Sequence, residues 1–183
     1  MLANILRTDP EVHRVLPAVS EHGRAIKALA GQHQEAIWAL HQTISRLRSV
    51  LLEFYPQALQ TFPHLKHRAA LTVLTAVPTP SADQKLTRRR LKILLRRSGR
   101  RNDPNLVEQI LNDLKSPALR QPPQVEAALG AVTTGLLGII APMHQAVDAL
   151  EEELGRTFDT HPLAPILRSG SGPRTDPCSP HPR

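Results

Sequence analysis

Aromatic residues are scarce in this 183-residue chain, where one Trp, one Tyr and three Phe make up 3% of the sequence. So small a share is unfavourable for a β-sandwich and for a surface that stacks nucleic-acid bases on aromatic rings. The chain also has a single cysteine, Cys178. One cysteine excludes an intramolecular disulfide framework and a cysteine-based zinc cluster.

Long hydrophobic runs are missing as well. The N-terminal residues lack a basic segment followed by an apolar core, so we expect no export signal. The most apolar stretch, Leu136–Met143, is interrupted by Gly138 and Pro142 and is too short to span a bilayer. We therefore expect a cytoplasmic protein without membrane contact.

Acidic residues are outnumbered by basic ones. The chain has 23 Lys plus Arg against 16 Asp plus Glu, so its net charge is +7 and its pI is about 10.5. A balance of this kind is typical of a protein with a polyanionic partner.

Two long apolar seams predict two long helices, Ser20–Tyr55 and Pro123–Phe158. Apolar residues recur in both at alternating steps of three and four, which keeps them on one helix face. We expect the two helices to pair antiparallel in the manner of a coiled coil. The seam of the first is Ile37, Leu40, Ile44, Leu47, Leu51 and Phe54, and that of the second is Val125, Leu129, Val132, Leu136, Ile139, Met143, Ala146 and Leu150.

Three shorter helices are predicted between the long ones. The first covers His64–Val77, the second follows a capping Thr87 and ends at Gly99, and the third begins at Asp103-Pro104. The expected fold is therefore all-α, with an antiparallel long pair and three short helices. The tail, residues 166–183, has no aliphatic or aromatic side chain after Leu167, so we expect it to be disordered.

A basic run is the strongest candidate functional feature. Eight of the fourteen residues from Arg88 to Arg101 are basic and none is acidic. Contacts from several of them to phosphates would make nucleic-acid binding fall steeply with salt. The alternative is a solvated face that keeps an apolar helix soluble. The candidate nucleic-acid-binding residues are Arg88, Arg89, Arg90, Lys92, Arg96, Arg97, Arg100 and Arg101.

Other polar groups make weak candidates for chemistry. His64 and His67 could share a metal, but no Cys or acidic residue lies at helical spacing from them. The side chains of Glu151–Glu153 would diverge by about 100° per residue on a helix, and Cys178 has no nearby base. We therefore expect no catalytic residue, no metal site and no cofactor.

Several segments, in colinear order, resemble insertion-sequence transposases with a DEDD acidic site and a serine nucleophile, the insertion sequence one-hundred-and-ten family. The likeness covers roughly residues 2–169. The segments that carry it are Leu2–Asp9, His13–Pro17, Ser20–Glu21, Ile44–Pro56, Pro78–Pro80, Leu86–Arg88, Leu94–Arg97, Arg120–Pro123 and His161–Ser169.

The resemblance implies a three-part plan for the whole protein. A RuvC-like nuclease domain holds a divalent metal (Mg²⁺ is the expected ion) on four acidic residues. A helical coiled-coil region helps dimerisation, and a C-terminal domain supplies the attacking serine. Members of the family act on DNA with a guide RNA.

Mapped onto that plan, residues 1–19 match the end of the RuvC-like domain and residues 20–165 the helical region. Residues 166–183 match the start of the transposase domain, whose pattern is lost after Ser169 in the way a frameshift would cause. The acidic ligands and the serine are then missing.

The expected function is that of a transposase fragment, truncated at both ends, that keeps the dimerisation and nucleic-acid-binding region for DNA transposition or recombination and is inactive alone. Its expected partners are DNA, guide RNA and a second copy or an intact transposase. One alternative is a pure coiled-coil interaction module that blocks intact transposase. Another is a pseudogene product without function.

Overall fold

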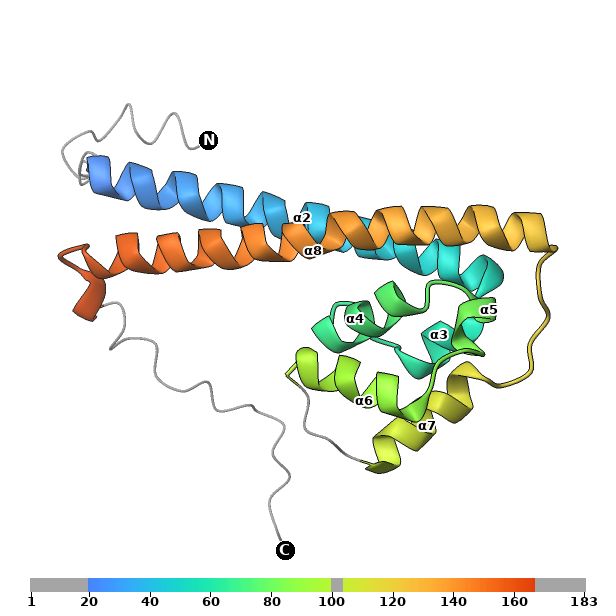
Figure 1. The fold of residues 1–183 in the computed structure, drawn as a ribbon. Coiled ribbons are helices and arrows are strands. Elements are labelled where there is room, and N and C mark those ends of the chain that lie inside the picture. Colours follow the sequence, from blue (N-terminus) through green and yellow to red (C-terminus); the bar gives the residue numbers. More distant parts are fainter. Residues whose placement is uncertain (1–19, 100–103, 167–183) are drawn as a thin grey trace, which may run out of the picture. The chain divides into compact units, whose positions relative to one another are not determined.

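The computed structural model describes residues 20–99 and 104–166, and every regular element in these ranges is a helix (Figure 1). The predicted domain remnant at residues 1–19 lies outside the described residues, as does residue 167 onward of the predicted tail. The helices are α2 (Glu21–Phe54), α3 (Pro56–Thr61), α4 (Arg68–Ala76), α5 (Pro80–Asp83), α6 (Arg88–Arg97), α7 (Pro104–Leu114) and α8 (Pro123–Asp159).

The described chain divides into two compact units. In the helix-end unit, residues 20–32 and 152–166, the start of α2 meets the end of α8. His22 Nε2 lies 2.7 Å from the backbone oxygen of Thr157 and 3.2 Å from Thr160 Oγ1. The hydroxyl of Ser20 accepts a bond from the backbone N–H of Gly23, which caps α2 as its sequence predicts.

The central unit, residues 33–151, contains the main hydrophobic core. Leu47 and Leu51 of α2 are fully buried in it together with Ile140 of α8. Thr43 on α2 lies beside Met143 on α8, with 3.7 Å between Oγ1 and Sδ. The predicted antiparallel pair of long helices is confirmed.

Short helices complete the central unit, with α3 packed on α7 and α6 packed on both α4 and α7. The three predicted short helices correspond to α4, α6 and α7. The structure adds α3 and α5, which the sequence analysis did not anticipate. Both begin with a proline at the first helical position, Pro56 and Pro80. They are only six and four residues long, too short for an apolar period to be recognised.

The face that α8 buries differs from the predicted seam. Val125, Val132 and Ile139 are 40, 48 and 53% exposed. Ala146 is exposed too, and the other predicted seam residues are half-buried. The line of fully buried positions runs one residue further along, because α8 turns an acidic side chain and a glycine towards α5. This line is Glu126, Gly130, Thr133, Leu137 and Ile140.

Helix α8 is also more apolar as a whole than its interrupted hydrophobic stretch suggests. An 18-residue window of it has a mean hydropathy of 1.6, enough to cross a membrane by length and composition. Of that window, 28% is buried inside the protein. A long apolar helix that leaves one side exposed has a surface that favours contact with something else.

Candidate nucleic-acid interface

Helix α6 carries the basic residues, and its local sequence explains why it forms. The hydroxyl of Thr87 accepts a bond from the backbone N–H of Arg90 at 3.3 Å, as predicted for an N-cap. Gly99 has φ +80°, a left-handed conformation that suits glycine and ends the helix. Leu91 and Leu95 are buried, so the opposite side of α6 faces solvent.

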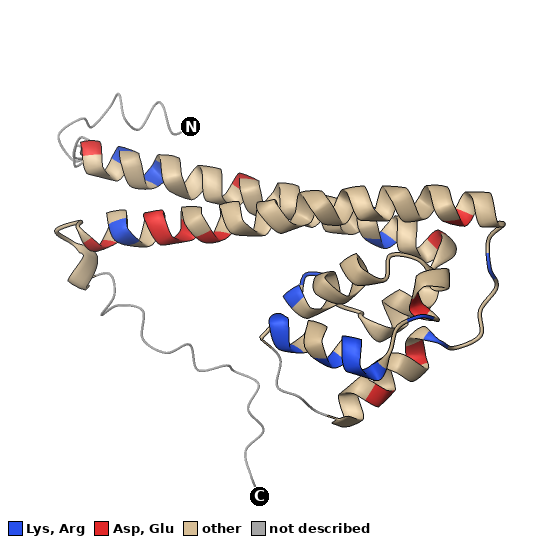
Figure 2. Ribbon diagram, in the orientation of Figure 1, with Lys and Arg blue, Asp and Glu red and all other residues tan. Residues whose placement is uncertain are grey.

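The cations of α6 lie on that solvent side in two rows. Arg89, Lys92 and Arg96 follow steps of three and four, and Arg90 and Arg97 lie one heptad apart, about 100° further round. The four arginines of the rows are exposed and Lys92 is half-buried. Figure 2 shows α6 as the helix with the densest run of basic residues.

One of the predicted residues is engaged within the protein. Arg88 Nε lies 2.5 Å from Glu108 Oε1 on α7, and both side chains remain partly exposed. This ion pair ties α6 to α7 and offsets the unfavourable position of a cation at a helix N-terminus. Among the described residues no ion pair involves the four exposed arginines, Arg89, Arg90, Arg96 and Arg97.

Arg100 and Arg101, which complete the predicted set, lie outside the described residues. The structure therefore brings Arg88, Arg89, Arg90, Lys92, Arg96 and Arg97 together on one helix. The face they form offers charge without aromatic rings. It can hold phosphate oxygens by charge-assisted hydrogen bonds but has nothing on which to stack a base.

Most of the histidines and glutamates considered as metal ligands in the sequence analysis contact each other or a neighbouring cation. The rings of His64 and His67 pack edge to face with centroids 5.8 Å apart. Glu152 and Glu153 pair with Arg156 of the next turn. In residues 20–99 and 104–166 no three His, Cys, Asp or Glu side chains are placed to hold a metal ion.

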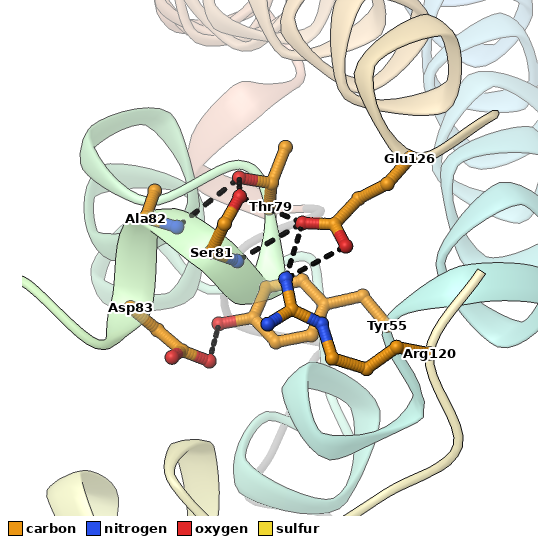
Figure 3. A network of polar contacts seen from close by, with 7 residues as sticks. All are labelled: Tyr55, Thr79, Ser81, Ala82, Asp83, Arg120 and Glu126. Atoms are coloured by element: carbon orange, nitrogen blue, oxygen red, sulfur yellow. Dashed lines mark hydrogen bonds and ion pairs between the residues drawn. The ribbon is translucent and has the colours of Figure 1, made fainter. Parts of the chain in front are cut away.

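A polar network between α5 and α8 was missed by the sequence analysis (Figure 3). Glu126 is 6% exposed and accepts bonds from the backbone N–H and the hydroxyl of Ser81, at 3.0 and 2.7 Å. The guanidinium of Arg120 donates to both Glu126 oxygens, at 2.8 and 2.7 Å. Burial acts to raise the pKa of Glu126, but these bonds outweigh it and hold the pKa below its ordinary value.

The same network includes a buried tyrosine and a buried aspartate. The hydroxyl of Tyr55 donates to Asp83 Oδ2 at 3.0 Å, and both residues are almost fully buried. Burial raises the pKa of Asp83, against the lowering effects of the Tyr55 bond and of the Arg120 and Lys115 charges. Burial and the neighbouring carboxylate also raise the pKa of Tyr55. The available sequence signal was Thr79-Pro80, a capping residue followed by proline.

The chain is similar in sequence to proteins of two insertion elements. It is 39% identical over 180 residues to the mini-circle putative transposase for IS117 of Streptomyces coelicolor, covering 94% of this chain and 44% of that protein. It is 29% identical over 178 residues to an uncharacterized 43.6 kDa protein of insertion element IS110 from the same organism, covering 96% of this chain and again 44% of the relative.

No family model and no solved structure matches the chain. The chain spans less than half the length of the curated relatives it matches, and the matched region includes the whole helical part described above. The chain is thus a homologue of insertion-sequence transposases of the IS110/IS117 type, over a region that accounts for 44% of their length.

Proposed function

We propose that this chain is the nucleic-acid-binding helical region of an IS110/IS117-type transposase, serving DNA transposition or recombination. The observation that carries the proposal is the cationic face of α6, where four exposed arginines have no acidic partner among the described residues. The transposase relatives supply DNA as the polyanion that this face would meet. Guide RNA presents the same phosphates and is the second expected ligand.

Salt-dependent binding tests the proposal. The full chain is mixed with labelled duplex DNA and with structured RNA at increasing salt, and binding is followed by gel shift. The paired substitution Arg89→Gln and Arg96→Gln should weaken binding and lower the slope of log K against log salt by about two, since each phosphate contact contributes about 0.9.

The matched control removes the same charge elsewhere. Arg24→Gln with Lys27→Gln on α2 gives the same net charge and should leave the slope nearly unchanged. An equal loss of nucleic-acid binding in the two double variants would mean that only the net charge of the chain matters. If the wild-type chain binds neither DNA nor RNA at low salt, the proposal is wrong.

A second copy of the chain is the second proposed partner, for which α8 provides a specific surface. Eight positions of α8 at alternating steps of three and four are all exposed, and none is charged. We call this line the outer seam. It consists of Val125, Ala128, Val132, Gly135, Ile139, Pro142, Ala146 and Ala149.

The outer seam lies on nearly the opposite side of α8 from the buried line, as the helical period of 3.6 residues requires. Large and small residues alternate on it from Val125 to Ile139, and a Cβ added at Gly135 would meet nothing within 4 Å. A partner helix could therefore approach closely at the small residues, as in paired helices with knobs-into-holes packing. An intact transposase with the same seam would compete for the site.

Sedimentation equilibrium tests this pairing. Ile139→Lys on the outer seam should convert a dimer to a monomer, whereas Gln145→Lys, exposed on another side of α8, should not. A wild-type monomer, or wild-type binding to lipid vesicles without self-association, would contradict the pairing.

We propose finally that the chain alone does not cut or join DNA. The resemblance assigns neither the acidic metal ligands nor the attacking serine of the family to a residue of this sequence, which supports the proposal. Purified chain with Mg²⁺ should leave supercoiled DNA intact. Nicking that survives repeated purification and is lost on chelation would overturn this part of the proposal.

A further inference from the structure

The single tryptophan of the chain lies on the surface. Trp38 belongs to the part of α2 that is in the central unit, and it is 60% exposed. Exposed tryptophans are enriched where proteins contact other molecules, because the indole ring combines a large apolar face with a polar N–H. The residues around the ring indicate which kind of molecule fits there.

Trp38 forms one end of a groove along α2. A hollow beside the ring is lined by Trp38, His41, Gln42, Ser45 and Arg46. These residues share one face of the helix, because they follow Trp38 at three, four, seven and eight positions. A second hollow of about 390 Å³ is also lined by His41 and Ser45, so the two adjoin each other. We call the two hollows together the α2 groove.

The second half of the α2 groove lies between α2 and the segment that joins α3 to α4. Ile44 and Pro63 give it apolar sides, and Arg48 and Lys66 line it as well. Arg48 Nη1 donates to the backbone oxygen of Pro63 at 3.2 Å. This bond links the two walls and restricts the position of the Arg48 guanidinium.

The charged residues of the α2 groove are all basic. Arg46, Arg48 and Lys66 line it and are exposed, and no Asp or Glu lines either half. Among the described residues none of these three cations forms an ion pair. Glu35 is exposed one turn before Trp38, but it lines neither hollow. The groove therefore offers an aromatic ring beside cations that are available to phosphates.

We propose that the α2 groove binds an unpaired stretch of nucleic acid, with one base stacked on the ring of Trp38 and the neighbouring phosphates held by Arg46, Arg48 and Lys66. The inference rests on the proposed function for the class of ligand, and it adds a second site to the cationic face of α6. Stacking on Trp38 requires a base with a free face, which a single strand or an RNA loop offers and a continuous duplex does not.

The fluorescence of Trp38 tests the stacking directly, because the chain has no other tryptophan. Three short strands of equal length and charge are titrated into the full chain at low salt: an oligothymidylate, an oligouridylate and an abasic oligodeoxynucleotide. The strands that carry bases should quench the fluorescence. The abasic strand should leave it unchanged at the same occupancy, which is followed by anisotropy of a label on the strand. Quenching by one of the two base-carrying strands alone supports the inference and identifies DNA or RNA as the ligand.

Variants of Trp38 measure the contribution of the ring. Trp38→Ala should weaken oligothymidylate binding about tenfold, an effect typical of losing one base–aromatic stack, and should leave binding of the abasic strand unchanged. Trp38→Phe keeps an aromatic ring and should retain most of the affinity. Leu52→Ala is the matched control, because it removes a 66% exposed apolar side chain from α2 outside the groove, and it should bind as wild type does.

Lys66→Gln tests the phosphate contacts. It should weaken oligothymidylate binding and lower the slope of log K against log salt by about 0.7, the contribution of one phosphate contact on a single strand. Lys27→Gln removes the same charge from an exposed position of α2 in the helix-end unit and should leave the slope nearly unchanged. An equal change in the two variants would overturn the assignment of phosphate contacts to the groove.

The outcomes separate this inference from the proposed function. Strands that bind without quenching Trp38, or an abasic strand that quenches it equally, would overturn the inference and leave the cationic face of α6 unaffected. If Arg89→Gln with Arg96→Gln leaves nucleic-acid binding unchanged while the base-carrying strands still quench Trp38, the α6 proposal is wrong and the groove is supported. If no strand binds at low salt, both are wrong. Fluorescence that changes on dilution of the chain without nucleic acid would indicate that Trp38 lies in a contact between copies, and it would overturn the inference.

Discussion

Glu126 shows how a single buried side chain sets the orientation of a long helix. It receives four hydrogen bonds, from Ser81 and Arg120, while it is 6% exposed. A buried carboxylate with this many donors is stable as the charged form. Because Ser81 and Arg120 lie outside α8, their bonds to Glu126 hold the start of that helix against α5 and the preceding segment.

We predict that Glu126→Gln destabilises the protein by about 1–3 kcal/mol at neutral pH, the usual effect of losing a charged hydrogen-bond partner. Urea unfolding measures the difference. Glu152→Gln, on an exposed glutamate paired only within its own helix, should change stability by less than about 0.5 kcal/mol.

The effect of Glu126→Gln should depend on pH. The folded-state pKa of Glu126 lies below its ordinary value. The stabilisation is therefore complete above the unfolded-state pKa and is lost as the pH falls through the folded-state pKa. The difference in the free energy of unfolding between wild type and Glu126→Gln should become smaller as the pH falls. A difference that grows would contradict the lowered pKa of Glu126.

His144 predicts a second pH dependence, nearer neutrality. Burial lowers its pKa, against the raising effect of Asp148 and with the lowering effect of Arg68, and its Nε2 is buried without a hydrogen-bond partner in the described structure. The folded protein thus binds the proton less readily than the unfolded chain. The contribution of His144 to the free energy of unfolding is therefore complete above a pH of about 6.5, the ordinary pKa of histidine. It decreases as the pH is lowered.

The measurement is thermal unfolding at pH 7.5 and pH 5.5. Wild type should lose more stability over this interval than His144→Leu. His33→Gln, a half-buried histidine on α2, is the control and should behave as wild type does. An identical loss in all three proteins would show that His144 contributes nothing to the pH dependence.

At the scale of elements, α8 has two apolar faces, the buried line and the outer seam, and makes one close contact at Gly130. A Cβ built at Gly130 would lie 2.4 Å from Thr79 Cγ2, closer than real Cβ contacts. Thr79 cannot turn away freely, because its hydroxyl caps α5 by accepting from the backbone N–H of Ala82. Glycine at this position lets the two elements meet.

We therefore predict that Gly130→Ala destabilises the protein by about 1–3 kcal/mol, the cost of overpacking a close contact. Gly138→Ala on the same helix should instead stabilise it by about 0.5–1 kcal/mol, since its Cβ would meet nothing within 4 Å and alanine favours the helix. If Gly130 contacts Thr79 as described, the unfolding temperature should fall in Gly130→Ala and rise in Gly138→Ala, relative to wild type.

At the scale of the whole molecule, burial is unevenly distributed along the two long helices. No residue of α2 before Leu40 is fully buried, whereas Leu47 and Leu51 are completely enclosed. In residues 152–166 only Ala164 is buried. Helical hydrogen bonds with little apolar burial around them open at low free energy.

Native-state hydrogen exchange should reveal this difference. We predict that amides of α2 before residue 33 and of α8 after residue 151 exchange much faster than amides near Leu47 and Ile140. Uniform protection along both long helices would contradict the prediction and would indicate an additional partner at the helix ends.

The sequence by itself determined the elements that have strong local signals. The all-α class, the two long helices and the cap of α6 follow from apolar spacing, Thr87 and Gly99, because these depend on neighbours within a few residues. The basic face of α6 was also visible, since Leu91 and Leu95 indicate which side is buried and leave the arginines outside.

Only the tertiary structure decided which side of α8 faces the core. Its apolar residues satisfy more than one helical seam, so periodicity alone predicted Val125, Val132 and Ile139 as buried. The choice comes from Glu126 and Gly130, which meet Ser81 and Thr79 some 50 residues earlier. The α2 groove has the same origin, because it is formed by α2 and the segment after α3, which no local pattern brings together.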